Sequence, residues 1–438
     1  MLTNTQFDHK SSWNFDDKIF WQQKGKRIAY VNLMCSVPCL LLAFSVWFIW
    51  SAVVTRLNTI GFSFTQAQLF TLAGIPGLSG ATLRILYSFI VPIFGGKNWT
   101  FLSTISLLLP SYFVGVAIQD VSSSYGYFVG LAFLCGFGGG NFASSMSNIS
   151  FFFPKNLQGI ALGINAGIGN LGVSVLQFTV PFVITFPLFG DFCGFPQILK
   201  NGNNIWLQNS AFVWIFPIVF FSVIALIFMD NLVIGKSSIL EQLVIFKRKH
   251  MYITTWLYIM SFGSFIGYSA AFPLLIKTQF PSIDPLKYAF LGPMVGALIR
   301  PVGGWLSDKI TGSAVTFYNL WVMIFAVFGV MYFISPTTRN FHGFFFMFLL
   351  LFLTTGIANG SVFQIIPMLF EKRESAAILG FSSAIAAYGA YFIPKTFALS
   401  ITYTSDVKFA LYCFIIYYIT CIFLIWWYYF RKNCEVKC

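Results

Sequence analysis

The stretch NLVIGKSSILEQLVIFKRK, residues 231–249, divides the chain into two halves of the same kind. It carries five charged residues, three of them consecutive at its end. Six apolar stretches precede it and six follow, each long enough for the roughly 30 Å hydrocarbon core of a bilayer, which takes about 20 residues per helix. We therefore expect an N-terminal tail and six-helix bundle over 1–230, a cytoplasmic connecting segment over 231–249, and a C-terminal six-helix bundle with a short tail over 250–438.

Composition indicates that lipid is the solvent for most of this chain. Of its 438 residues, 57% are hydrophobic and only 9% are charged, with a mean hydropathy of +0.78. Soluble domains of this length do not normally have such values. The sequence predicts an all-α membrane protein with twelve transmembrane helices, at 30–56, 66–93, 98–118, 125–152, 156–187, 208–230, 250–277, 285–307, 313–335, 342–370, 374–400 and 407–430.

The basic residues indicate topology. In this arrangement 17 of the 26 lysines and arginines fall on the side of both termini, seven fall on the opposite side, and two lie inside helices. The positive-inside rule then places both termini in the cytoplasm. The net charge of +13 does not suggest a nucleic-acid partner. The basic residues lie singly or in short groups between apolar segments and form no continuous patch in the sequence.

Acidic residues and histidines are expected only in tails, loops and helix ends. None of the 13 acidic residues or three histidines is placed at mid-membrane. An intramembrane enzyme would need a catalytic pair or metal ligands there, and a proton-driven drug exporter would need a buried acid. The eight cysteines are scattered and form no disulfide or metal pattern. We therefore expect a non-enzyme with no cofactor and no metal.

Two arginines are the charged residues expected deep in the membrane. Arg84 lies about midway along the helix at 66–93, and Arg300 lies in the helix at 285–307. One such arginine could snorkel to an interface or brace a helix end. These two are 216 positions apart, close to the 217 that separate Lys155 from Lys372, so they occupy equivalent places in an internal repeat. A central site with two cations and no carboxylate suits an anion, and a planar guanidinium fork fits a planar oxyanion better than an ammonium does.

Polar and aromatic side chains near these arginines are further candidates. The helix at 125–152 contains GFGGGNFASSMSN from Gly136, and the helix at 156–187 contains GIALGINAGIGNLG from Gly159. Most of these glycines are expected to allow close helix packing. Asn141 and Asn170 are candidates for a polar layer around an anion. Tyr258 and Phe262, four positions apart, share a helix face on which Tyr258 offers a hydroxyl donor.

The glycine-rich stretch 136–172, together with GFSSAIAAYG at 380–389, resembles the paired signatures of the nitrate/nitrite porter family of the major facilitator superfamily. The loop GGWLSDK at 303–309 resembles the signature loop of that superfamily. Its counterpart FGGKN at 94–98 lacks the acidic residue. The resemblance extends over essentially all twelve helices, and it implies the major facilitator fold, with two pseudo-symmetric six-helix bundles and a substrate between them.

The resemblance also implies a function and a site. It implies nitrate and nitrite as substrates, alternating access, location in a bacterial inner membrane, and a protein that works as a monomer. It assigns the anion clamp to Arg84 and Arg300, the pocket lining to Tyr258, Phe262 and Phe142, and a polar contact to Asn170. Because no Asp, Glu or His is placed at mid-membrane, nitrate/nitrite antiport is favoured over proton-coupled nitrate symport. Transport of another small monovalent anion is the second alternative.

The chain departs from the expected family pattern at three positions where glycine would stand. These positions are Ala166, Ala386 and Ala390. Each added methyl group could tighten helix contacts while the two halves rock. We expect this difference to affect the transport rate more than the substrate.

Overall fold

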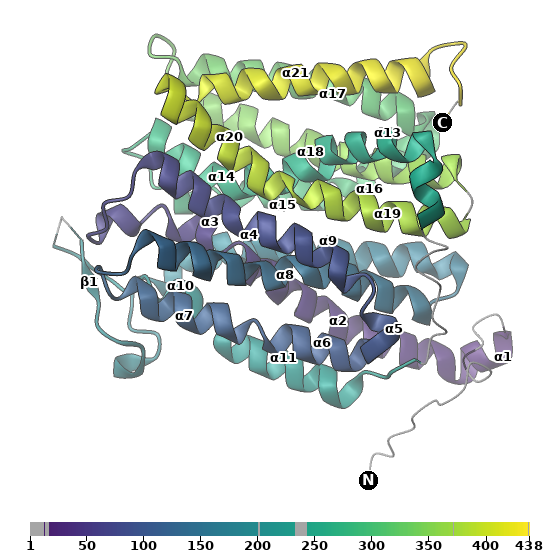
Figure 1. The fold of residues 1–438 in the computed structure, drawn as a ribbon, viewed down its shortest axis with the longest axis horizontal. Helices are drawn as coiled ribbons and strands as arrows, with labels where there is room; N and C mark the ends of the chain where they lie inside the picture. Colours follow the sequence, from purple (N-terminus) through teal and green to yellow (C-terminus); the bar gives the residue numbers. More distant parts are fainter. Residues whose placement is uncertain (1–12, 14–16, 200–201, 233–242, 371, 437) are drawn as a thin grey trace.

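Twelve long helices lie side by side in the computed structural model, with the C-terminal half above the N-terminal half in the view of Figure 1. The structure describes residues 13, 17–199, 202–232, 243–370, 372–436 and 438. Twelve of the described helices are long and apolar enough to cross a membrane, which confirms the predicted number. They span Trp21–Trp47, Gln66–Tyr87, Gly96–Ile118, Tyr125–Phe152, Leu157–Val183, Asn209–Phe228, Lys249–Gln279, Pro285–Ile310, Gly312–Ile334, Phe341–Leu369, Ile378–Thr404 and Lys408–Phe430.

The N-terminal half contains the first six spans and a short hairpin. Its elements are α1 (Lys18–Phe20), η1 (Trp21–Gly25), α2 (Lys26–Trp47), α3 (Ile49–Val53), η2 (Leu57–Thr59), α4 (Gln66–Tyr87), α5 (Val91–Phe94), α6 (Gly96–Ile105), α7 (Leu108–Ile118), α8 (Tyr125–Phe152), α9 (Lys155–Val183), η3 (Gly190–Cys193), β1 (Gln197–Ile198), β2 (Asn204–Ile205), α10 (Asn209–Phe212) and α11 (Ile215–Phe228). The antiparallel pair β1 and β2 lies in the connection between the fifth and sixth spans.

The C-terminal half repeats this plan without a hairpin among its described residues. Its elements are η4 (Leu243–Lys247), α13 (Lys249–Tyr258), η5 (Ile259–Gly263), α14 (Ser264–Gln279), η6 (Pro285–Lys287), α15 (Leu291–Leu298), α16 (Arg300–Ile310), α17 (Gly312–Ile334), α18 (Phe341–Leu369), α19 (Lys372–Ala387), α20 (Gly389–Thr404), α21 (Lys408–Ile425) and η7 (Trp426–Phe430). Most of the predicted connecting segment, residues 233–242, lies outside the described residues.

The first span begins earlier than the predicted 30–56. It is helical from Trp21, and its regular part ends at Trp47, before a break at Phe48. The missed turns are amphipathic, because Lys24 and Lys26 are exposed whereas Gly25 is buried. A hydropathy average over these turns is polar, because it combines the exposed and the buried face, so hydropathy alone does not detect them.

Several spans are interrupted along their length, and three of them belong to the C-terminal half. The seventh contains the π-helical turn η5, the eighth breaks at Ile299, and the eleventh breaks at Tyr388. The break in the eighth span has a clear cause, because Pro301 has no N–H to donate to the preceding turn. A π-helical turn inserts an extra residue and redirects the side chains near it, and such turns are common at functional sites. These interruptions determine where the side chains of the site point.

Glycines bring helices of the same half close together. A Cβ added to Gly139 of α8 would lie 2.7 Å from the Cα of Gly80 on α4, closer than real Cβ contacts allow. The packing prediction for the glycines of the fourth span is therefore confirmed here. Gly169 and Gly172 of α9 also pack closely, so most glycines of the two quoted stretches pack as predicted. At Gly159, Gly163 and Gly167 of α9 an added Cβ would meet no atom within 4 Å. These three glycines face open space.

The two halves meet tightly at one end of the molecule, which we call the distal end and which carries the turns between α17 and α18 and between α20 and α21. Arg56 forms an ion pair with Asp284 across the halves, with Nη2 2.7 Å from Oδ1. Ser174 donates to the carbonyl oxygen of Phe290 at 2.8 Å, again across the halves. The distal end is therefore closed.

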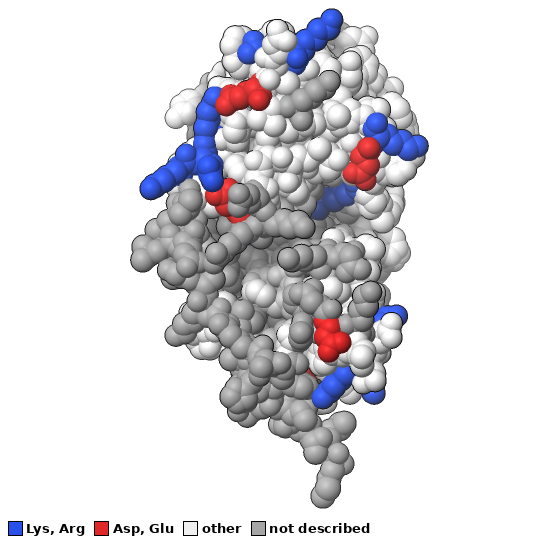
Figure 2. Space-filling model, turned by 90° about the vertical axis from the view of Figure 1, so that its right-hand side faces the viewer, with Lys and Arg blue, Asp and Glu red and all other residues white. Residues whose placement is uncertain are grey.

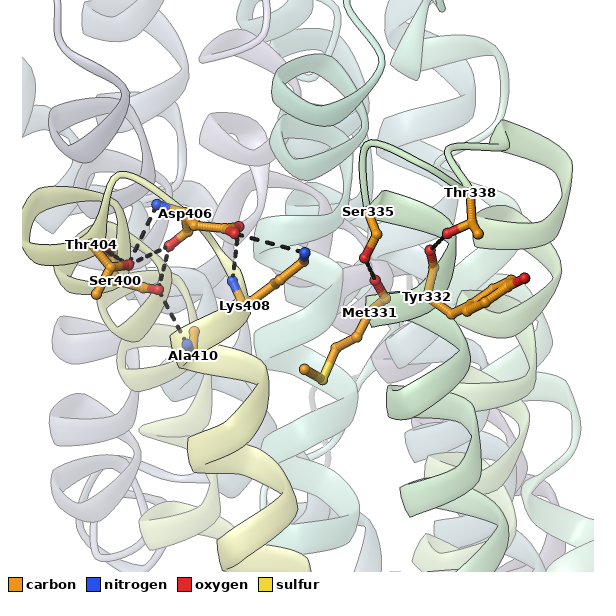
Figure 3. Close-up of polar contacts among 9 residues, drawn as sticks. All are labelled: Met331, Tyr332, Ser335, Thr338, Ser400, Thr404, Asp406, Lys408 and Ala410. Carbon is orange, nitrogen blue, oxygen red and sulfur yellow. Dashed lines mark hydrogen bonds and ion pairs between the residues drawn. The ribbon is translucent and has the colours of Figure 1, made fainter.

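Side chains cap the turns at the distal end (Figure 3). Ser400 of α20 accepts from the backbone N–H of Ala410 and donates to the carbonyl oxygen of Asp406. Asp406 in turn accepts from the backbone N–H of Lys408, at 3.2 Å. Ser335 caps the end of α17 in a similar way by donating to the carbonyl oxygen of Met331. These bonds satisfy backbone groups that the helix ends leave unpaired.

The opposite, proximal end carries α1 and the C-terminal residue (Figure 1). Figure 2 looks onto this end and shows lysine and arginine side chains spread around its rim, several of them beside carboxylates. Two ion pairs here, both at 2.8 Å, join Arg248 to Glu374 and Lys249 to Glu435, and both lie within the C-terminal half. An added Cβ at Gly163 in one half or at Gly380 in the other would meet no atom within 4 Å.

Candidate anion site

An aromatic ring separates the two buried arginines. The ring of Phe262, in the π-helical turn η5, has the Cζ atom of Arg84 at 5.3 Å and that of Arg300 at 5.6 Å from its centroid. Arg84 also lies 4.6 Å from the ring of Phe142, and Arg300 lies 4.5 Å from the ring of Phe265. Cations over ring faces at these distances are attracted by the ring quadrupole, most strongly where water is excluded. The predicted pair of arginines therefore converges on one place.

The rings themselves form a column that crosses between the halves. Phe142 of α8 stacks on Phe262 with centroids 6.2 Å apart, and Tyr258 of α13 stacks on Phe262 at 5.7 Å. The structure thus brings together the predicted aromatic residues. It adds Phe265 and also Trp47, whose ring lies 5.4 Å from Arg84. Phe265 follows Phe262 by one helical turn, a spacing that could have identified it, whereas nothing distinguishes Trp47 in a chain with 20% aromatic residues.

Arg84 is fully buried and bridges the halves. Its Nε donates to the carbonyl oxygen of Gly139 at 3.1 Å, and its Nη1 donates to that of Ser383 on α19 at 3.2 Å. The alternative that this arginine braces backbone carbonyls is therefore true in part. Its Nη2 has no partner among the described residues. Arg84 lies in the last turn of α4, which ends before the predicted 93, and not midway along the helix.

Arg300 begins α16, at the break before Pro301. The residue is partly exposed, but its Nε and Nη2 atoms are buried and have no hydrogen-bond partner among the described residues. The ion pairs among the described residues include neither Arg84 nor Arg300. Buried cationic donors without an acceptor are strongly unfavourable, so the site has the donors that an anion would satisfy.

The two predicted asparagines have different surroundings. Asn170 on α9 is fully buried; its Nδ2 donates to the carbonyl oxygen of Ala166 at 2.6 Å, and its Oδ1 has no partner among the described residues. Asn141 on α8 donates to the carbonyl oxygen of Ser103 at 3.3 Å, inside the N-terminal half. Among the described residues, no hydrogen bond joins Asn141 to either guanidinium. It lines a small polar cavity between α2, α6 and α8 instead.

Another asparagine, which the sequence analysis missed, lies beside the site. Asn359 on α18 stands one turn before Phe363, whose ring lies 5.4 Å from that of Tyr258. Tyr258 stacks on Phe262, the ring over which both guanidinium groups lie. Asn359 is 5% exposed, and its Nδ2 has no hydrogen-bond partner among the described residues. It stands 218 positions after Asn141, nearly the offset of the internal repeat, and this offset could have identified it.

Comparison with known proteins places this chain in a family. A model described as Major Facilitator Superfamily matches residues 35–394. The nitrate/nitrite transporter NarU of Escherichia coli (strain K12) is 45% identical over 97% of this chain and 97% of that protein. The probable nitrate/nitrite antiporter NarK2 of Thermus thermophilus is 39% identical over the full length of both. The chain belongs to the nitrate/nitrite porter family of the major facilitator superfamily.

Solved structures similar to this porter support the fold. A bacterial homologue of the human lysosomal transporter Spinster has a TM-score of 0.71 at 14% identity, over 91% of this chain and 96% of that one. The D-xylose–proton symporter has a TM-score of 0.67 at 16% identity, over 91% of this chain and 97% of that one. These similarities concern the fold alone. They agree with the predicted arrangement of two six-helix bundles.

The geometry of the porter site limits what it can bind. Unpaired N–H groups of two guanidinium groups point to a ligand with several acceptor atoms, and the flat rings of Phe142 and Phe262 favour a planar one. The aromatic walls exclude water, which strengthens each charge-assisted hydrogen bond. A small planar oxyanion meets all of these conditions.

Proposed function

We propose that this porter carries nitrate and nitrite across a bacterial inner membrane by alternating access, exchanging one anion for the other. The anion binds between Arg84 of the N-terminal half and Arg300 of the C-terminal half. Tyr258, Phe262 and Phe142 line its pocket, and Asn170 supplies a further polar contact. The protein acts as a monomer and does no chemistry on its substrate.

One observation carries this proposal. Three buried N–H-bearing atoms, Nη2 of Arg84 and Nε and Nη2 of Arg300, have no acceptor among the described residues. The arginines come from opposite halves and share the ring of Phe262. An anion placed between them supplies the missing acceptors and joins the halves. The names of the relatives, a nitrate/nitrite transporter and a probable nitrate/nitrite antiporter, identify the class of anion.

Exchange follows from the electrostatics of the empty site. When the halves close, the two guanidinium groups approach each other, and like charges about 6 Å apart at an effective dielectric of about 20 repel by about 3 kcal/mol. A monovalent anion between them converts this repulsion into attraction. A ligand favours the state that it binds better, so the loaded carrier crosses more readily than the empty one. Among the described residues, no Asp, Glu or His lies in the aromatic column to carry a proton.

The orientation in the membrane follows the charge distribution. Lysines and arginines are spread over the proximal end (Figure 2), which by the positive-inside rule faces the cytoplasm. Both termini are then cytoplasmic, and the closed distal end faces the periplasm. The structure then represents an inward-facing state.

Transport by the purified full-length protein in liposomes tests this proposal. Uptake of labelled nitrate is measured into vesicles that contain either nitrite or an impermeant anion, with and without an inward proton gradient. We expect uptake to require internal nitrite and to be unaffected by the gradient. Matched vesicles without protein correct for leakage.

Two results would replace the proposal with one of its alternatives. Uptake into nitrite-free vesicles that rises with the proton gradient would establish proton-coupled symport. Efficient exchange of another monovalent anion, with nitrate as a weak competitor, would show that nitrate is not the substrate. Absence of both activities would remove the transport proposal itself.

A further inference from the structure

The surroundings of Asn359 suggest a role that rests on the proposed anion transport. Asn359 belongs to the face of α18 that packs on the seventh span. One turn further along, the ring of Phe363 lies 5.4 Å from that of Tyr258. Asn359, one turn before Phe363, therefore lies on the side of α18 next to Tyr258. The residue is 95% buried, and its Nδ2 has no partner among the described residues.

Glycines on either side of Asn359 fix its distance from Arg300. A Cβ added to Gly360 would overlap the carbonyl oxygen of Arg300, and one added to Gly356 would overlap that of Gly296. Helix α18 therefore lies directly against the backbone at the break between α15 and α16. No side chain separates the two backbones at these glycines, so the backbone at Asn359 is held close to the start of α16.

The Tyr258 hydroxyl can accept one hydrogen bond and donate another at the same time. A tyrosine hydroxyl has one hydrogen to donate and a lone pair that can accept. An amide N–H that donates to the oxygen leaves the hydroxyl hydrogen free to point elsewhere. Tyr258 stacks on Phe262, and both guanidinium groups lie over that ring, so an anion bound between the arginines is an acceptor close to the hydroxyl. Hydrogen bonds arranged in such a chain polarise one another and become stronger.

We propose that Asn359 is a positioning residue of the anion site. When the anion is bound, its Nδ2, which has no partner among the described residues in the present state, donates to the Tyr258 hydroxyl and so directs the hydroxyl hydrogen toward the oxyanion. Asn359 acts through Tyr258 and does not contact the anion. Its repeat counterpart Asn141 bonds to the backbone of α6 and forms no hydrogen bond with a tyrosine among the described residues. The polar layer around the anion is therefore asymmetric, with its oriented hydroxyl supplied by the C-terminal half.

A double-mutant cycle on the full-length protein tests this role. Sodium nitrate is titrated by isothermal calorimetry into wild type, Asn359→Leu, Tyr258→Phe and the double variant. We expect each single variant to bind nitrate on the order of tenfold more weakly, the scale of one hydrogen bond to a charged group. The double variant should be no weaker than Tyr258→Phe, because residues that act as a unit are not additive. Asn359→Ala repeats the cycle with a smaller side chain, in case the leucine variant does not fold.

Other outcomes of the same experiment would overturn the role. Losses that multiply to about a hundredfold in the double variant would show independent contacts, and an unchanged affinity in the Asn359 variants would show no contribution. Asn319→Leu is the matched control. It removes a buried amide of α17 that donates to the carbonyl oxygen of Thr354, a residue on the same helix, α18, as Asn359. A similar loss of nitrate affinity in Asn319→Leu would show that the loss in the Asn359 variants reflects general destabilisation of the protein. Failure of the wild type to bind nitrate would instead reject the proposed function.

Discussion

At the scale of single residues, the two arginines are equivalent in the repeat but not in their bonding. Arg84 is tied to the backbone of both halves through the carbonyl oxygens of Gly139 and Ser383. Arg300 makes no such bond among the described residues and is held by the ring of Phe265 and the break at Pro301. In the proposed site we therefore expect Arg84 to contribute to stability as well as binding, and Arg300 mainly to binding.

Conservative replacements should separate these contributions. Arg84→Lys and Arg300→Lys both retain the charge but lose the two-donor fork. We expect nitrate affinity to fall at least tenfold in each, which corresponds to about 1.5–3 kcal/mol for a hydrogen bond to a charged group. Arg84→Lys should also lower the melting temperature of the detergent-solubilised protein more than Arg300→Lys does. Near wild-type uptake by a correctly inserted Arg300→Lys protein would exclude this residue as a clamp.

The same residues show what the sequence can predict about the site. Both arginines could be found because charges are rare in a membrane-embedded chain and because their spacing matches the repeat. The roles of Asn141 and Asn359 could not be assigned, because a shift of one turn or a rotation of the helix decides whether an amide faces a neighbouring backbone or the site. That rotation depends on packing against other helices, through contacts such as that between Gly360 and Arg300.

At the scale of elements, the glycines of the spans are of two kinds. Gly77 of α4 lies directly against the backbone of Ala390 at the start of α20, across the halves. Gly163 of α9 faces open space. The twelve spans could be predicted from the sequence, because a helix that crosses the membrane needs a long run of apolar residues, which hydropathy detects. It could not distinguish these two kinds of glycine, because the difference depends on which end of the carrier is closed.

Adding one methyl group at each position should bias the carrier in opposite directions. In Gly77→Ala the new Cβ would lie 2.5 Å from the backbone nitrogen of Tyr391, so α4 and α20 must separate and the distal end should open. Gly163→Ala meets nothing in the present state but should obstruct closure of the proximal end. Thr71 of α4 lies at the contact between the halves, where Lys395 of α20 donates from Nζ to its hydroxyl at 3.4 Å. We expect a cysteine at this position, in a variant without the eight native cysteines, to react faster with an impermeant maleimide in Gly77→Ala and more slowly in Gly163→Ala. Equal rates in both would contradict this assignment.

At the scale of the whole molecule, polar contacts help to hold the distal end shut. Among the described residues, the ion pair between Arg56 and Asp284 is the one that joins full charges across the halves. Their side chains are 18% and 30% exposed, so the pair is partly shielded from solvent. It joins the segment after α3 to the turn at η6, and Asp284 also caps that turn by accepting from the backbone N–H of Leu286. The pair can form only when the halves approach each other at this end. It therefore contributes to the relative stability of the distal-closed state and not to the folding of either half.

Breaking this ion pair should shift the carrier toward the distal-open state. Partly exposed pairs contribute at most about 1 kcal/mol, so Arg56→Gln or Asp284→Asn should raise maleimide labelling at position 71 a few-fold, and high salt should reduce the difference from wild type. The double variant Arg56→Asp with Asp284→Arg should return labelling toward the wild-type rate, since it restores an attractive pair between the halves. Asp406→Asn is the matched control, because Asp406 pairs with Lys408 at 4.0 Å within a single turn of the C-terminal half. An effect of Asp406→Asn equal to that of Asp284→Asn would contradict this role of the ion pair. No recovery in the charge-swapped variant would do the same, and would leave apolar packing and hydrogen bonds between neutral groups to hold the distal end shut.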